Sequence, residues 1–154
     1  MKKIFFSLVL MVVGTTFLFA QAPERVQVTF KTKYPDAQGT TWTTVGSNYQ
    51  ATYMDKNGVH NMVVFNNDGS IVRSESEMDM KEYPANVRSY YEKKYPGEKD
   101  YHVWVVTDAN GEKTYYIPSE HAGVRYYFDK TGNYLREEKN KMKEEMKEHK
   151  DNDK

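Results

Sequence analysis

The chain has 154 residues, with 22 Lys and Arg against 22 Asp and Glu, and it contains no cysteine. The absence of cysteine excludes disulfides, thiolate metal sites and thiol catalysis. The balanced charge argues against a nucleic-acid-binding protein, which needs a basic face, and gives no reason to expect attraction to an anionic membrane surface. A chain of this length can be held together by its apolar core alone.

The first 22 residues have the three parts of a secretory signal peptide. Lys2 and Lys3 form a positive start, an apolar stretch covers residues 4–13, and Ala20 and Ala22 offer small residues for cleavage. The alternative is an uncleaved anchor helix, but the apolar stretch falls short of the ~20 residues that a membrane span needs. The sequence therefore predicts a periplasmic or secreted protein with no stable membrane anchor after cleavage near Ala20 to Ala22.

One pattern of apolar residues and prolines occurs twice, at residues 23–35 and again at residues 84–96. Its apolar positions recur every four residues, which is the stripe of one helix face. A proline begins each copy, where the first helical turn tolerates it, and a second proline ends each copy. Each copy therefore predicts a helix. The stripe residues are Val26, Phe30 and Tyr34 in the first copy and Val87, Tyr91 and Tyr95 in the second.

Short β-type segments separated by turn signals follow each predicted helix. Residues 55–58, 66–69, 108–111 and 129–132 each end in a glycine where a hairpin turn needs positive φ. The sequence predicts an α+β protein of two tandem repeats, each with one helix packed on a four-stranded antiparallel β-meander. The repeats would span residues 23–80 and 81–138.

Residues 139–154 form a charged C-terminal tail in which Met142 and Met146 are the only large apolar residues. This composition favours a solvated helical extension, because two methionines make a thin apolar stripe. The alternative is a helix that binds a partner.

No catalytic or metal-binding constellation stands out. The four histidines, His60, His102, His121 and His149, have no ligand spacing, and no nucleophile motif or phosphate-binding glycine loop is present. We therefore predict a protein that is not an enzyme and that has neither a cofactor nor a metal site.

Tyrosine is abundant, with 13 residues, and there are two tryptophans. Tyr and Trp are favoured in binding surfaces, but they also suit strands and cores. If Trp42 and Trp104 both face the helices, strand alternation makes the opposite face polar in the first repeat and apolar in the second. That second face is either a partner surface or is covered by another part of the chain, and a one-residue register error would exchange the faces. Its predicted residues are Tyr101, Val103, Val105, Tyr116, Arg125 and Tyr127.

The repeated helix pattern, the following tryptophan and the closing Phe-x-x-x-Gly hairpin resemble the PepSY-like proteins, which are β-lactamase-inhibitor-like proteins of the bacterial envelope. The resemblance implies tandem helix-plus-sheet units, no enzymatic activity, and binding or inhibition of an envelope enzyme through a concave, aromatic sheet surface. We accordingly predict an exported module that binds or inhibits an envelope protein or peptidase, with an envelope protein or peptide as partner. The alternative is a periplasmic carrier of a small ligand or metal, which would use His60 and His102.

Overall fold

The structure is a computed structural model that describes residues 22–120 and 122–139. The predicted signal peptide, apart from Ala22, and the predicted tail, apart from Lys139, lie outside these residues. Within the described residues, no helix is both long and apolar enough to cross a membrane.

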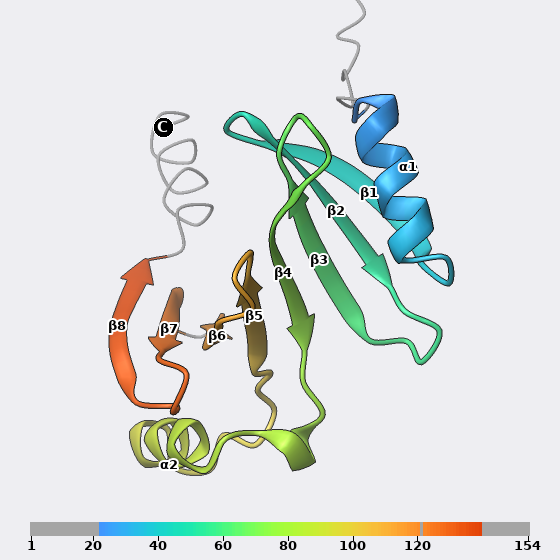
Figure 1. Cartoon of the computed structure of the whole chain (residues 1–154). Coiled ribbons are helices and arrows are strands. Elements are labelled where there is room, and N and C mark those ends of the chain that lie inside the picture. The colour runs from blue at the N-terminus through green and yellow to red at the C-terminus, as the bar shows by residue number, and fades with distance from the viewer. Residues whose placement is uncertain (1–21, 121, 140–154) are drawn as a thin grey trace, which may run out of the picture.

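Two ten-residue α-helices and eight strands make up the described part of the chain. Figure 1 shows how they are arranged. The helices are α1 (Glu24–Lys33) and α2 (Ala85–Lys94), and a 3-10 turn, η1 (Met80–Glu82), precedes α2. The strands are β1 (Gln38–Val45), β2 (Asn48–Met54), β3 (His60–Phe65), β4 (Ile71–Glu77), β5 (Trp104–Asp108), β6 (Lys113–Ser119), β7 (Val124–Phe128) and β8 (Tyr134–Lys139).

Both helices begin and end where the sequence predicts. Pro23 precedes α1, and the backbone N–H of Tyr34 closes its last turn by donating to the Phe30 carbonyl at 2.8 Å. Pro84 precedes α2 in the same way, and Tyr95 closes it. The prolines suit these positions because the first helical turn needs no N–H donor. The two predicted helices are confirmed.

Aspartate side chains shape three of the predicted hairpin turns. Oδ1 of Asp55 accepts hydrogen bonds from the backbone N–H of Asn57 at 2.7 Å and of Val59 at 3.0 Å, and Gly58 has φ +80°. Asp108 and Asp129 make the same pair of bonds in their own turns. A glycine suits each turn because positive φ is costly for other residues.

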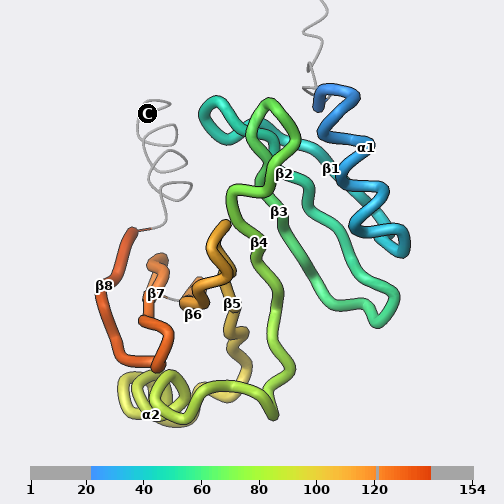
Figure 2. Tube along the Cα trace, in the orientation of Figure 1, coloured from blue at the N-terminus to red at the C-terminus, as the bar shows by residue number. Residues whose placement is uncertain are grey.

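The predicted fold class, an α+β protein of two helix-on-four-strand repeats, is wrong, because the described chain is mostly one eight-stranded antiparallel sheet. Strand β4 pairs antiparallel with β5 from Arg73 opposite Asp108 to Glu77 opposite Trp104. The eight strands therefore form one antiparallel sheet in the order β1 to β8, and α1 and α2 are the α-helices that the described residues place beside it. The physical reason is that β4 and β5 would otherwise both be edges with unpaired backbone groups. Figure 2 follows the chain from β4 through α2 to β5. The predicted boundaries of the two repeats stay a prediction.

Both helices pack on the same face of the sheet, because the strand registers put the core residues under α1 and under α2 on one side. Figure 1 shows that they cover different halves of the sheet. Helix α1 contributes Val26 and Phe30 to a core cluster with β2 and β3, and α2 contributes Val87 and Tyr91 to a cluster with β6 and β7. Strand alternation leaves every second side chain on the opposite side. We call that side the helix-free face; Met62 of β3 and Glu75 of β4 lie on it as neighbours in register.

Candidate binding site

Three of the six predicted surface residues lie on the helix-free face. Tyr116 of β6 is paired in register with Tyr127 of β7, and their ring centroids are 6.0 Å apart. Arg125 lies on the same face, with its guanidinium carbon 5.3 Å from the centre of the Tyr116 ring. The structure thus brings Tyr116, Arg125 and Tyr127 together.

The other three predicted residues lie on the helix side. Tyr101 and Val103 are buried in the core cluster of α2, and Val105 shares their side by alternation along β5. Their assignment to the helix-free face is therefore wrong. Trp104 takes that face instead, and its ring stacks on Tyr116 at a centroid distance of 6.0 Å and an interplanar angle of 10°.

The error comes from treating the two tryptophans as equivalent. Trp42 does face its helix, because its ring packs edge-on against Phe30 of α1 at a centroid distance of 5.3 Å. Trp104 comes one residue after the core position that Val103 fills. A shift of one residue moves a strand side chain to the opposite face.

A pocket of ≈330 Å³ opens on the helix-free face, across strands β4 to β8. Five strands contribute to its walls, mostly through side chains of the helix-free face, so it is a hollow of the sheet itself. Phe128, which belongs to the core under α2, also borders it. Sequence reasoning missed most of these residues, although the repeated Arg-x-Glu pattern at Arg73 and Arg136 includes three of them: Arg73, Glu75 and Arg136. The lining residues are Arg73, Glu75, Val106, Thr114, Tyr116, Arg125, Tyr127, Phe128, Leu135 and Arg136.

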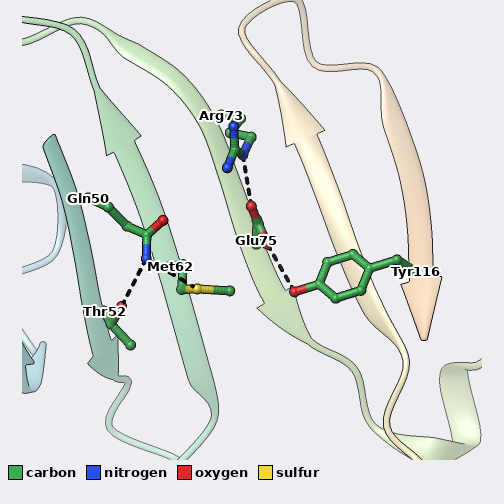
Figure 3. Close-up of polar contacts among 6 residues, drawn as sticks. All are labelled: Gln50, Thr52, Met62, Arg73, Glu75 and Tyr116. Atoms are coloured by element: carbon green, nitrogen blue, oxygen red, sulfur yellow. Dashed lines mark hydrogen bonds and ion pairs between the residues drawn. The ribbon is translucent and has the colours of Figure 1, made fainter. Parts of the chain in front are cut away.

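A buried carboxylate lies in this pocket. Glu75 is 7% exposed, and each of its oxygens has a partner: Nε of Arg73 donates to Oε1 at 2.8 Å, and Oη of Tyr116 donates to Oε2 at 2.9 Å (Figure 3). Burial and the neighbouring Glu75 charge raise the pKa of Tyr116 well above its ordinary value. Tyr116 therefore stays a neutral donor at all physiological pH values, and a buried charge needs such partners.

Two arginines of the pocket lie over tyrosine rings. Besides Arg125 over Tyr116, the guanidinium carbon of Arg136 on β8 lies 4.6 Å from the centre of the Tyr127 ring. A cation over a ring face is attracted by the ring quadrupole. The rings also limit where each guanidinium can move, so the site presents positive charge in a defined place.

The helix-free face of β2 and β3 has a different character. Nε2 of Gln50 donates to Thr52 at 3.5 Å and approaches the Met62 sulfur at 3.6 Å, as Figure 3 also shows. None of these three residues lines the pocket on the β4–β8 part of the face. The contrast predicted between a polar and an aromatic region thus holds for Gln50 and Thr52 against Tyr116 and Tyr127.

The histidines in the described chain do not form a metal centre. Within residues 22–120 and 122–139, no group of three His, Asp or Glu side chains is arranged to hold a metal ion. His102 pairs through Nδ1 with Oε1 of Glu77, and His60 is exposed at the start of β3. His121 and His149 lie outside the described residues.

Comparison with known proteins gives the fold a precedent. No protein-family model and no curated protein matches the chain. Among solved structures, it is similar to a provisionally periplasmic protein from Bacteroides eggerthii, with 24% identity and a TM-score of 0.63, over 77% of this chain and 88% of that one. A DUF2874 family protein from Bacteroides uniformis shows 23% identity and a TM-score of 0.61, over 77% and 89%.

A third similar structure is a BLIP-like protein from Bacteroides fragilis, with 20% identity and a TM-score of 0.54, over 77% of this chain and 86% of that one. At these identities the likeness establishes the fold alone. The chain therefore has the fold of the DUF2874 and β-lactamase-inhibitor-like structures, which agrees with the resemblance seen in its sequence motifs.

Proposed function

We propose that this protein is an exported, non-enzymatic binding module that docks an envelope protein or peptide on the β4–β8 part of its helix-free face. The observation that carries the proposal is the pocket itself, in which Arg125, Tyr127 and Arg136 lie around the buried side chain of Tyr116. Tyr, Trp and Arg are the residues in which interface binding energy concentrates. A hollow of ≈330 Å³ suits one or two partner side chains better than a large cofactor.

Within the described residues, the pocket lies on the face that no helix covers. Both described helices lie on the other face, so they leave this one uncovered. Leu135 at the pocket wall is 51% exposed, and an exposed apolar residue beside aromatic rings is typical of a contact surface.

The comparisons support the same class of function. One similar structure is described as BLIP-like, and another is provisionally assigned to the periplasm. Both descriptions fit a binding module that is exported by a signal peptide. Fold does not fix function, so the site has to be tested directly.

Photo-crosslinking in the native envelope tests the docking surface. A photoreactive amino acid replaces Leu135 in one variant and Val45 in the control; both positions are exposed, but Val45 lies in β1 at the far end of the sheet. We expect a discrete crosslinked partner from position 135 and none from position 45. In the Leu135 variant, Tyr127→Ser with Arg136→Ser should abolish the crosslink, whereas Gln50→Ser with Thr52→Ser should not. Equal crosslinking at both positions, or none at position 135, would refute the proposal.

A further inference from the structure

The pocket carries more positive than negative charge. Its lining includes Arg73, Arg125 and Arg136, but only one carboxylate, Glu75. Both oxygens of Glu75 are already engaged, by Arg73 and by Tyr116. The charge of Glu75 is thus compensated by Arg73 and Tyr116, and neither of its oxygens forms a hydrogen bond with Arg125 or Arg136.

The arginines keep donors available for a ligand. Arg73 bonds to Glu75 through Nε, and Arg136 bonds to Glu138 through Nε at 2.8 Å. In the described part of the chain, no carboxylate forms a salt bridge with Arg125. A guanidinium has five N–H donors in a fixed fork, so each arginine can still bind a carboxylate through its terminal nitrogens.

Glu138 acts as an internal carboxylate at the rim of the pocket. It is half exposed on β8, opposite Arg125 in register, and it pairs with Arg136. The hydrogen bond from Arg136, with a further contribution from the Arg125 charge, holds the pKa of Glu138 below its ordinary value. An exposed pair of this kind contributes little to stability, so a partner carboxylate can replace Glu138 at low cost.

We propose that the pocket is a subsite for a carboxylate of the docked segment, so that the partner binds through an acidic peptide whose carboxylate inserts among Arg73, Arg125 and Arg136. The inference rests on the proposed function and deepens it. Tyr127 beside the arginines provides an apolar wall, which favours an aromatic or aliphatic residue next to the acidic one.

Three synthetic peptides test the chemistry. The first alternates Glu with Tyr and has blocked ends, the second carries Gln in place of Glu, and the third is the Gln peptide with a free C-terminal carboxylate. Protein purified from the envelope of expressing cells is titrated with each, and the amide and arginine Nε–H signals are followed by NMR. We expect the Glu peptide to bind at least about tenfold more tightly than the blocked Gln peptide at pH 7. Binding of the third peptide at the level of the first would show that the subsite accepts a chain-end carboxylate as well as a side-chain one.

The ionisation of the ligand provides a second readout. The advantage of the Glu peptide should decrease as the pH falls below about 4.3 and should be lost at about pH 3, because its carboxylates take up protons while the arginines stay charged. It should also shrink with added salt, because the pocket is open to solvent.

Variants separate the subsite from general charge effects. Arg125→Gln should weaken binding of the Glu peptide about tenfold, whereas Arg25→Gln, an arginine of α1 on the helix side, should leave it unchanged. Glu138→Gln should tighten binding about two- to fivefold, because it removes the internal competitor.

The inference is overturned if the Glu and Gln peptides bind equally, if neither binds up to about 10 mM, or if Arg125→Gln has no effect. Should crosslinking at position 135 succeed in any of these cases, the proposed function stands and only the carboxylate subsite fails. Should both experiments fail, both proposals are wrong.

Discussion

The two halves of the sheet are closed against their helices by different side chains. The core under α1 consists mainly of side chains without polar atoms, and Phe30 packs there with Val26, Val63 and Phe65. The core under α2 is rich in tyrosine, whose hydroxyl groups must find partners when buried. The two halves thus share one arrangement of helix and strands. Apolar packing stabilises the half under α1, and packing together with tyrosine hydrogen bonds stabilises the half under α2.

The tyrosine core meets its hydrogen-bonding needs internally. Oη of Tyr91 donates to Oε1 of Glu98 at 3.0 Å and lies 3.4 Å from the Ser119 hydroxyl, and Oη of Tyr83 donates to the Tyr101 carbonyl at 3.0 Å. Burial raises the pKa of Tyr91 to about 12, so this hydroxyl remains a neutral donor. No buried side-chain N or O atom lacks a partner in the described residues.

The largest expected loss of stability comes from a substitution in the apolar core under α1. Phe30→Ala should lower the free energy of unfolding by about 3–5 kcal/mol, because Phe30 packs against the rings of Trp42, Tyr53 and Phe65. Urea unfolding measures the loss. Val28→Ala, on the exposed side of the same helix, should change it by less than about 0.5 kcal/mol. A loss below about 1 kcal/mol for Phe30→Ala would contradict the packing described.

A smaller effect is expected where a hairpin turn contacts α2. Gly132 has φ +81°, and a Cβ there would lie 3.2 Å from Cγ2 of Val87 and 3.3 Å from Cβ of Pro84. Gly111 has φ +83° with open space around it, so its substitution carries the same backbone strain without the contact. Gly132→Ala should therefore cost about 1–3 kcal/mol more than Gly111→Ala in thermal or urea unfolding. Equal costs would show that this turn does not press on the helix.

The smallest effect concerns the hydroxyl groups that distinguish the two cores. Tyr91→Phe keeps the ring but removes the hydrogen bonds to Glu98 and Ser119, so we expect a loss of about 1 kcal/mol in urea unfolding. Tyr49→Phe is the matched control, because the Tyr49 hydroxyl makes no hydrogen bond within the described residues. If Tyr91→Phe and Tyr49→Phe are equally stable, the Tyr91 hydroxyl does not stabilise the core under α2.

Local features of this fold could be predicted from the sequence because neighbouring residues determine them. The prolines at 23 and 84 and the four-residue spacing after each specify the helices, and the Asp-x-x-Gly segments specify hairpin turns through bonds within the same turn. The pairing of β4 with β5 could not be predicted, since two open edges can pair with each other or stay apart, and no local pattern decides between these outcomes.

The candidate site was only partly predictable for a related reason. Residues 101–106 are a nearly continuous apolar run, so alternation cannot tell which side of β5 faces the core. Tyr116, Arg125 and Tyr127 were placed on the correct face because their neighbours Tyr115, Tyr126 and Phe128 face the helix side, as the apolar pattern of β6 and β7 indicates. Arg73 and Glu75 were missed because they belong to β4 and join the site only through the pairing of β4 with β5.

That pairing has a thermodynamic consequence. The pocket takes Arg73 and Glu75 from the strand before the junction and every other wall from strands after it, so it exists only while both halves are folded and joined. A ligand bound there stabilises the assembled sheet over any half-folded form, in proportion to the logarithm of its concentration. Occupied protein should therefore resist proteolysis in α1, on the far side of the junction, as strongly as in the strands that hold the ligand.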